Sequence, residues 1–112
     1  MNTGYFAMMK RYSGLIPVSI ALYTPKAIKI REYPALCPSP YLLVNFKTGF
    51  CSQREYIDIF TSQLSKLDPH KVFEDLGENT VLLCYEKAGD FCHRRLVAVW
   101  LEKELGIEVN EA

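Results

Sequence analysis

The sequence lacks several features that would each indicate a particular class of protein. No apolar run reaches the roughly 18 residues of a membrane span, and the N-terminus has no long apolar core like that of a signal peptide. Neither charge is in excess, since 13 basic residues balance 13 acidic ones. A neutral chain has no global attraction to nucleic acid or to an anionic membrane, so a polyanion would need a local patch. We therefore expect a cytoplasmic protein with no membrane partner. Nucleic acid is a possible partner that the net charge does not support.

Paired cysteines, repeats and linkers are missing as well. The four cysteines are irregularly spaced and include no C-x-x-C pair, which favours free thiols in a reducing compartment over a disulfide framework. In particular, we expect no bond between Cys84 and Cys92. A chain of 112 residues without low-complexity segments has room for one hydrophobic core and little more. The sequence therefore predicts a single domain spanning residues 1–112.

The apolar segments that are present alternate between helix-like and strand-like patterns. Thr3 can cap the first helix, and Asp68-Pro69 separates two later ones. The predicted elements are a helix over about 4–12, a strand over 15–22, a helix over 53–67, a helix over 69–76, a strand over 81–84, a helix ending at 105 and a strand over 107–109. With right-handed crossovers, this order predicts an α/β fold: a short, mainly parallel sheet flanked by helices, as in a Rossmann-like three-layer sandwich. Residues 18–22 and 81–84 should be neighbouring parallel strands.

Residues 26–50 have no clear pattern. Pro34, Pro38 and Pro40 interrupt any regular element, and the apolar run over 41–44 is too short to assign. We interpret this segment as a loop-rich crossover that could serve as a lid.

The most informative stretch is 81–101, VLLCYEKAGDFCHRRLVAVWL. An apolar strand ends in a polar loop, which leads to CHRR at 92–95 and then to an apolar run of helical length. Asp90 is a suitable N-cap for this helix, and Gly106 a suitable end. Three cationic or potentially cationic side chains in a first turn oppose the helix macrodipole, at a cost of about 0.3–1 kcal/mol each. Because open α/β sheets bind ligands where strands feed such loops, we expect a negatively charged group there.

Cys92 has the surroundings of a reactive thiol. A helix N-terminus beside a histidine and an arginine lowers a thiol pKa from about 8.5 into the range of roughly 3.5–7.5. The thiolate could act as a nucleophile, with His93 as acid or base and Glu86 as general base. The alternative is that Cys92 is a small residue chosen for close packing, and that Glu86 pairs with an arginine. The loop after Cys84 does not follow the phosphatase pattern of a cysteine followed by an arginine at the next helix start.

Arg94 and Arg95 are candidates for anion binding. Guanidinium groups beside the free N–H groups of a helix start match the geometry of phosphate or carboxylate. Helical spacing turns Arg94 inward and Arg95 toward solvent, so Arg94 is the better candidate for binding an anion in the site. Ser19 or Thr24 should lie nearby, because parallel strands end at the same edge of a sheet. Alternatively, acidic side chains of the preceding loop neutralise both arginines and no ligand binds.

A metal or another cofactor is not expected. Cys84, Cys92 and His93 form a C-x7-C-H set, but a structural zinc site normally has four ligands at more regular spacing. His70, at a helix start, is most simply a surface residue.

The same residues carry a family resemblance. LCYEK at 83–87, followed by FCHR at 91–94 and the apolar helix, resembles the signature of the Domain of Unknown Function 488 family of small bacterial and phage proteins. Looser agreement at 3–5, 17–21, 24–25 and around Tyr56 extends the resemblance over most of the chain. It implies a compact α/β sandwich with a parallel sheet, and almost nothing about activity.

Three classes of function follow. The first is an enzyme for a phosphorylated or nucleotide-like substrate, with Glu86, Cys92, His93 and Arg94 converging on one solvent-accessible concavity. The second is a binding module that holds a small anionic ligand or a nucleic-acid end without catalysis. The third is an interaction protein in which the CHRR segment is a rigid structural corner. Neither a particular substrate nor the oligomeric state follows from the sequence.

Overall fold

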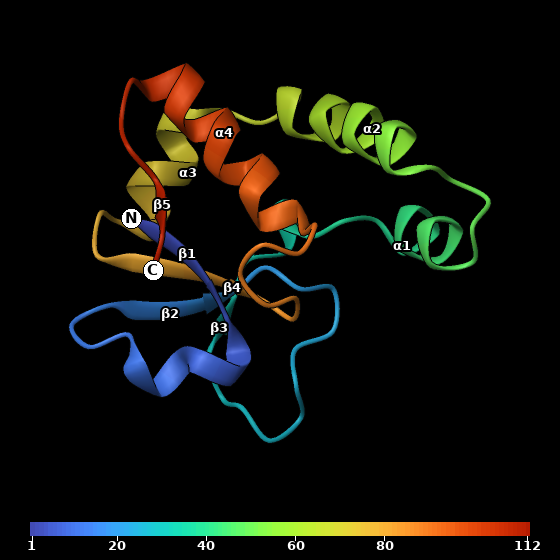
Figure 1. Cartoon of the computed structure of the whole chain (residues 1–112). Helices are drawn as coiled ribbons and strands as arrows, with labels where there is room; N and C mark the ends of the chain where they lie inside the picture. The colour runs from blue at the N-terminus through green and yellow to red at the C-terminus, as the bar shows by residue number, and fades with distance from the viewer.

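A five-stranded parallel sheet organises the computed structural model, which describes all 112 residues (Figure 1). The strands are β1 (Asn2–Tyr5), β2 (Ile16–Ser19), β3 (Arg31–Glu32), β4 (Thr80–Cys84) and β5 (Asn110–Glu111), and their order across the sheet is β3-β2-β4-β1-β5. All of the pairings are parallel. The α/β fold and its parallel sheet are therefore as predicted.

The central strand, β4, explains why the apolar run over 81–84 is continuous. Every residue of β4 is buried, and the strand pairs with β1 on one side and with β2 on the other. A strand covered on both faces needs apolar side chains at successive positions rather than at alternate ones. Val18 of β2 lies opposite Leu82 of β4, which confirms the prediction that these two strands are parallel neighbours.

The helices begin and end at residues that suit those positions. They are the 3₁₀ helices η1 (Phe6–Arg11) and η2 (Pro34–Leu36), and the α-helices α1 (Pro40–Lys47), α2 (Gln53–Ser65), α3 (Pro69–Leu76) and α4 (His93–Leu105). Ser52 and Glu55 form a capping box at the start of α2, and Asp68 accepts hydrogen bonds from the first N–H groups of α3. Gly106 ends α4 in the left-handed conformation, with φ 67°, as the sequence predicts.

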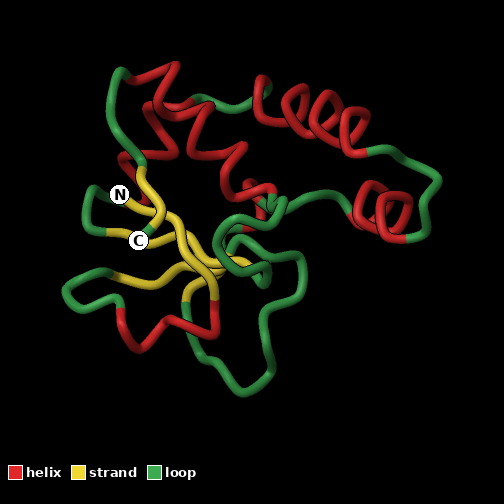
Figure 2. Tube along the Cα trace, in the orientation of Figure 1, coloured by secondary structure: helices red, strands yellow, loops and turns green.

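The two faces of the sheet are covered differently. Helices α2, α3 and α4 lie together on one face (Figure 1), where Leu82 belongs to the main hydrophobic core. Val81 and Leu83 point to the opposite face, which is covered by η1 and by the segment that follows β2, a loop in Figure 2. The chain after β2 and the chain after β4 therefore leave the sheet toward opposite faces.

The structure corrects the prediction at the N-terminus. Residues 2–5 form strand β1 rather than a helix capped by Thr3, and only Phe6–Arg11 is helical, as a 3₁₀ helix. Asn2–Tyr5 occupies the gap between β4 and β5, so sheet pairing overrides the weak local pattern. A side chain at Gly4 would force a rearrangement, because a Cβ there would lie 2.6 Å from the ring of Tyr12.

Other boundaries also differ from the prediction. Strand β2 ends at Ser19 rather than at residue 22, and the last strand is at 110–111 rather than at 107–109. Within 26–50, the predicted loop-rich crossover contains β3, η2 and helix α1. The Ser39 side chain accepts a hydrogen bond from the N–H of Leu42, and Pro40 begins α1, a start that proline favours.

The C-terminal strand is held by a partly buried ion pair. The Arg94 side chain is 1% exposed and donates hydrogen bonds to both carboxylate oxygens of Glu111, at 3.2 and 2.7 Å. The Thr3 hydroxyl donates another to Glu111, at 2.6 Å. Burial alone would raise the pKa of the Glu111 carboxyl, but these hydrogen bonds outweigh it and lower that pKa below its usual range.

We predict that Glu111→Gln destabilises the fold by about 3 kcal/mol, because it leaves the buried Arg94 charge without its partner. Since folding lowers the pKa of Glu111, the stabilising effect is present at neutral pH and is lost as the pH falls through the folded-state pKa. Chemical denaturation at a series of pH values should therefore show a difference between wild type and variant that shrinks in acid. Glu108→Gln, at an exposed position near the same end, is the matched control. Equal stability of the two variants at neutral pH would contradict the prediction.

Candidate active site

A cavity lies at the carboxyl end of the sheet, where the segments that follow β2 and β4 leave the sheet toward opposite faces. Its volume is about 240 Å³. One wall comes from residues 21–23 after β2, a second from 84–86 and 91–93 around the β4–α4 loop, and a third from α1 and α2. This is the crevice in which open α/β sheets bind ligands.

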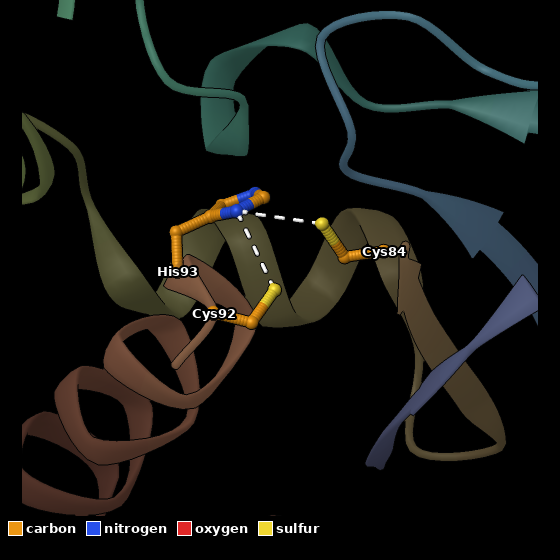
Figure 3. A group of neighbouring side chains, drawn as sticks. All are labelled: Cys84, Cys92 and His93. Carbon is orange, nitrogen blue, oxygen red and sulfur yellow. Dashed lines mark hydrogen bonds between the residues drawn. The ribbon is translucent and has the colours of Figure 1, made fainter. Parts of the chain in front are cut away.

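Cys84, Cys92 and His93 meet in the wall of this cavity (Figure 3). Both sulfur atoms point toward the His93 ring, with Nδ1 3.6 Å from Cys84 Sγ and 3.8 Å from Cys92 Sγ. The other ring nitrogen, Nε2, lies 2.6 Å from the carbonyl oxygen of Ile20, to which it must donate. In the neutral ring, Nδ1 is therefore the nitrogen without a proton, and it can accept one from a thiol.

The two thiols differ in acidity. The hydrogen bond from Cys84 is the main cause that lowers the pKa of Cys92 to about 6; His93 and the backbone N–H of Arg94 lower it further, while burial opposes them. The pKa of Cys84 is raised, because its proton is held in the hydrogen bond to Cys92 and because the thiol is buried. Cys92 is therefore the thiolate of the pair at neutral pH, and Cys84 is its proton-bearing partner.

Glu86 lies beside the thiols at the exposed side of the cavity. Its Oε2 lies 3.3 Å from Cys84 Sγ, within hydrogen-bond distance. Burial would raise the pKa of Glu86, but hydrogen bonding at the thiol pair and the charge of His93 lower it. The carboxylate is consequently ionised at neutral pH, and its role as a general base stays a prediction.

The α4 helix starts two residues later than the predicted N-cap would place it. Cys92, not Asp90, is the N-cap residue, and no side chain caps this helix. Asp90 is exposed and lies in a turn in which its N–H bonds to the carbonyl of Lys87. Without a side-chain cap, the N–H groups of the first turn remain available to an anion, here the Cys92 sulfur.

The predicted anion-binding residues do not line the cavity. Arg94 pairs with Glu111, and the prediction that it points into the concavity is wrong. Arg95 is not turned to solvent either: it donates to the Thr3 hydroxyl and to the carbonyl of Val109, at 2.7 and 3.0 Å. The negative partner expected at the helix start is thus Glu111, not an acid of the preceding loop.

Ser19 and Thr24 also make internal contacts. Ser19 is fully buried, and its hydroxyl accepts a hydrogen bond from Thr24 at 2.7 Å. Thr24 also lies 2.8 Å from a carboxylate oxygen of Glu32. Anion binding by these two residues and by the arginines stays a prediction, since every contact described for them is with the protein itself.

The structure adds side chains that the sequence did not single out. Tyr56 and Phe91 line the cavity together with Phe46 and Lys47 of α1. The rings of Phe46, Tyr56 and Phe91 pack against one another with centroids 4.9 to 5.5 Å apart. Tyr56 falls in the apolar stripe of its helix and therefore looks like a core residue, whereas the Ser39-Pro40 pair was a usable signal for α1.

A metal ion is the remaining chemical alternative at this site. The ligand atoms of Cys84, Cys92 and His93 all lie within 4.8 Å of one another, close enough to share an ion. Three protein ligands are one fewer than a closed structural zinc site has. The expected absence of a metal stays a prediction. None of the four cysteines is in a disulfide bond.

The fold and the site together define a small parallel α/β protein with a thiol–imidazole pair at the carboxyl end of its sheet. A family model described as the active DUF488-N3 subclade matches residues 16–105, and the chain belongs to this DUF488 family. The resemblance inferred from the LCYEK and FCHR segments is thereby confirmed. Searches of curated proteins and of solved structures give no match. No helix in the structure is both long enough and apolar enough to cross a membrane.

We predict that iodoacetamide alkylates Cys92 selectively, with a rate that rises with pH and is half-maximal near pH 6. The other cysteines should react slowly at neutral pH, because burial raises the pKa of Cys37 to about 11 and also raises that of Cys51. Peptide mass analysis of chelator-treated protein identifies the modified residue. In His93→Gln, the half-maximal pH should move toward the ordinary thiol pKa of about 8.5. A midpoint above 8 in the wild type would contradict the prediction.

Proposed function

We propose that this protein is a cytoplasmic enzyme in which the Cys92 thiolate attacks a small nucleotide-like substrate bound in the cavity. One observation carries the proposal: Cys92 is the N-cap of α4, borders the cavity and has His93 Nδ1 3.8 Å from its sulfur. Helix start, imidazole and cavity are the three conditions that a thiol nucleophile needs. A reducing compartment keeps such a thiol free.

The reaction divides the roles among three side chains. Cys92 Sγ forms a bond to an electrophilic atom of the substrate, and the leaving group departs with the electron pair of the broken bond. His93 Nδ1, which takes up the thiol proton, returns it to that leaving group. Glu86 then takes a proton from the water that attacks the substrate, and the bond to Cys92 breaks with its electron pair on sulfur, which regenerates the thiolate. The proton on Glu86 passes through solvent to His93, which restores the starting state. The helix start and the apolar cavity stabilise the negative charge that develops during these steps.

The cavity wall supports a substrate with a planar, weakly polar part. Most of the lining side chains are apolar, and Phe46, Tyr56 and Phe91 give it an aromatic wall on which a nucleobase could stack. Lys47 is the basic side chain of the lining apart from His93, and it can meet a phosphate. A sugar phosphate without a base would leave the aromatic wall unused.

Two alternatives from the sequence have less support. A module that binds anions without catalysis would use the arginines, yet these contact Glu111, Thr3 and Val109. A rigid structural corner would have no need of a cavity beside Cys92. The description of the matching family as an active subclade also favours an enzyme.

We expect nucleosides and nucleotides to raise the melting temperature, and sugar phosphates without a base to leave it unchanged. A ligand at 100 times its dissociation constant stabilises the folded state by about 2.7 kcal/mol, which a thermal shift assay detects easily. Lys47→Ala should reduce the shift given by nucleotides but not that given by nucleosides. Lys10→Ala is the matched control, since Lys10 is exposed and lies in η1. Stabilisation by sugar phosphates alone, or by no compound of the panel, would contradict the substrate class.

Turnover of a stabilising compound should depend on Cys92. Cys92→Ser is expected to abolish product formation, followed by chromatography, while the melting shift with that compound is retained. Cys51→Ser changes a buried cysteine outside the cavity and should keep activity. Unchanged turnover by Cys92→Ser would exclude the covalent mechanism.

A further inference from the structure

The hydroxyl group of Tyr56 has no assigned partner. The residue is 3% exposed, its ring lies in the aromatic wall, and its Oη makes no hydrogen bond with the protein. The only buried side-chain nitrogen or oxygen that is both sealed from solvent and without a partner is Arg94 Nη1. Tyr56 Oη therefore reaches accessible space, and the accessible space that Tyr56 borders is the cavity beside Cys92.

Tyr56 differs from the other two tyrosines of the cavity lining. Tyr85 donates its hydroxyl hydrogen to the carbonyl of Tyr23, and Tyr23 itself is 68% exposed, so water can reach its hydroxyl. A phenol that is nearly buried and unpaired is costly unless something else accepts its hydrogen bond. A bound substrate is the natural acceptor for Tyr56.

We propose that Tyr56 Oη–H donates a hydrogen bond to the substrate oxygen on which negative charge develops when Cys92 attacks. This inference rests on the proposed function and adds a catalytic residue to it. The substrate class it requires has a carbonyl, phosphoryl or similar acceptor oxygen attached to the atom that Cys92 attacks. Such a donor is worth most in a site of low dielectric, which the apolar wall provides.

The surroundings keep the proton on Tyr56. Burial is the main cause that raises the pKa of this phenol, and negative charge at Cys92 and Glu86 raises it further. Tyr56 consequently remains a donor over the pH range in which Cys92 is a thiolate.

The reaction of p-nitrophenyl acetate with Cys92 separates this role from the nucleophile. The thiolate forms a bond to the carbonyl carbon, the carbon–oxygen bond to the nitrophenol breaks, and p-nitrophenolate leaves with the electron pair. No proton has to be supplied to this leaving group, so the hydroxyl can act only on the carbonyl oxygen. Iodoacetamide is the comparison reagent, because its displacement of iodide develops no charge on the carbonyl oxygen.

Tyr56→Phe should slow the release of p-nitrophenolate by about tenfold or more, since removal of one oxyanion donor costs roughly 10²–10³-fold in enzymes. Its rate with iodoacetamide and the midpoint of that pH profile should stay at wild-type values. The variant keeps the ring and its contacts with Phe46 and Phe91, and an unchanged melting temperature verifies this. Tyr41→Phe, at an exposed position of α1 outside the cavity lining, is the matched control with wild-type rates.

Each outcome decides between the two proposals. Equal rates of wild type and Tyr56→Phe with p-nitrophenyl acetate would overturn the role of Tyr56 and leave the nucleophile in place. Equal losses with both reagents would also overturn it, because the hydroxyl would then act on the thiolate itself. A wild-type reaction that is no faster than that of Cys92→Ser would overturn the proposed function and this inference together.

Discussion

The pairing of β4 with a parallel strand on each side is the constraint on which the rest of the structure depends. Because β4 is buried on both faces, its polar atoms must bond within the sheet, and chemistry can begin only where the strand ends. That end is Cys84, directly followed by the loop that returns to α4. Strand β2 ends alongside it but continues to the opposite face, and the space left between the two continuations is the cavity.

Two clusters of charge share the first turn of α4 without merging. Arg94 turns away from the cavity to the Glu111 carboxylate, so its charge ties the last strand to the helix. Cys92 and His93 remain at the cavity side with Cys84. The Cys92 thiolate nevertheless affects both clusters. Burial lowers the pKa of Arg94, and Cys92 acts together with Glu111 to raise it. The first turn of α4 thus contributes to the thiol through the backbone N–H of Arg94, while the Arg94 side chain serves the ion pair.

The aromatic wall shows how a packing element can also define a binding site. Phe46, Tyr56 and Phe91 come from α1, α2 and the β4–α4 loop, and their edges hold these three segments together. The segment predicted as a possible lid therefore contributes a helix that is fixed by ring contacts and forms one side of the cavity. The unpaired hydroxyl of Tyr56 is the polar exception in this wall.

Elements with strong local signals, and the centre of the site, could be predicted from the amino-acid sequence. The continuous apolar run of β4, the amphipathic pattern of α2, the helix boundaries at Asp68 and Gly106 and the CHRR segment after a strand are all local features, and they place Glu86, Cys92 and His93 together at a strand end. The N-caps predicted at Thr3 and Asp90 were wrong, and the remaining features depend on tertiary contacts. Strand β1 exists because β4 and β5 pair with it, Arg94 turned to a carboxylate 17 residues away, and Tyr56 became part of the site because helix packing opened its hydroxyl to the cavity. Such contacts join residues distant in the chain, and no local pattern encodes them.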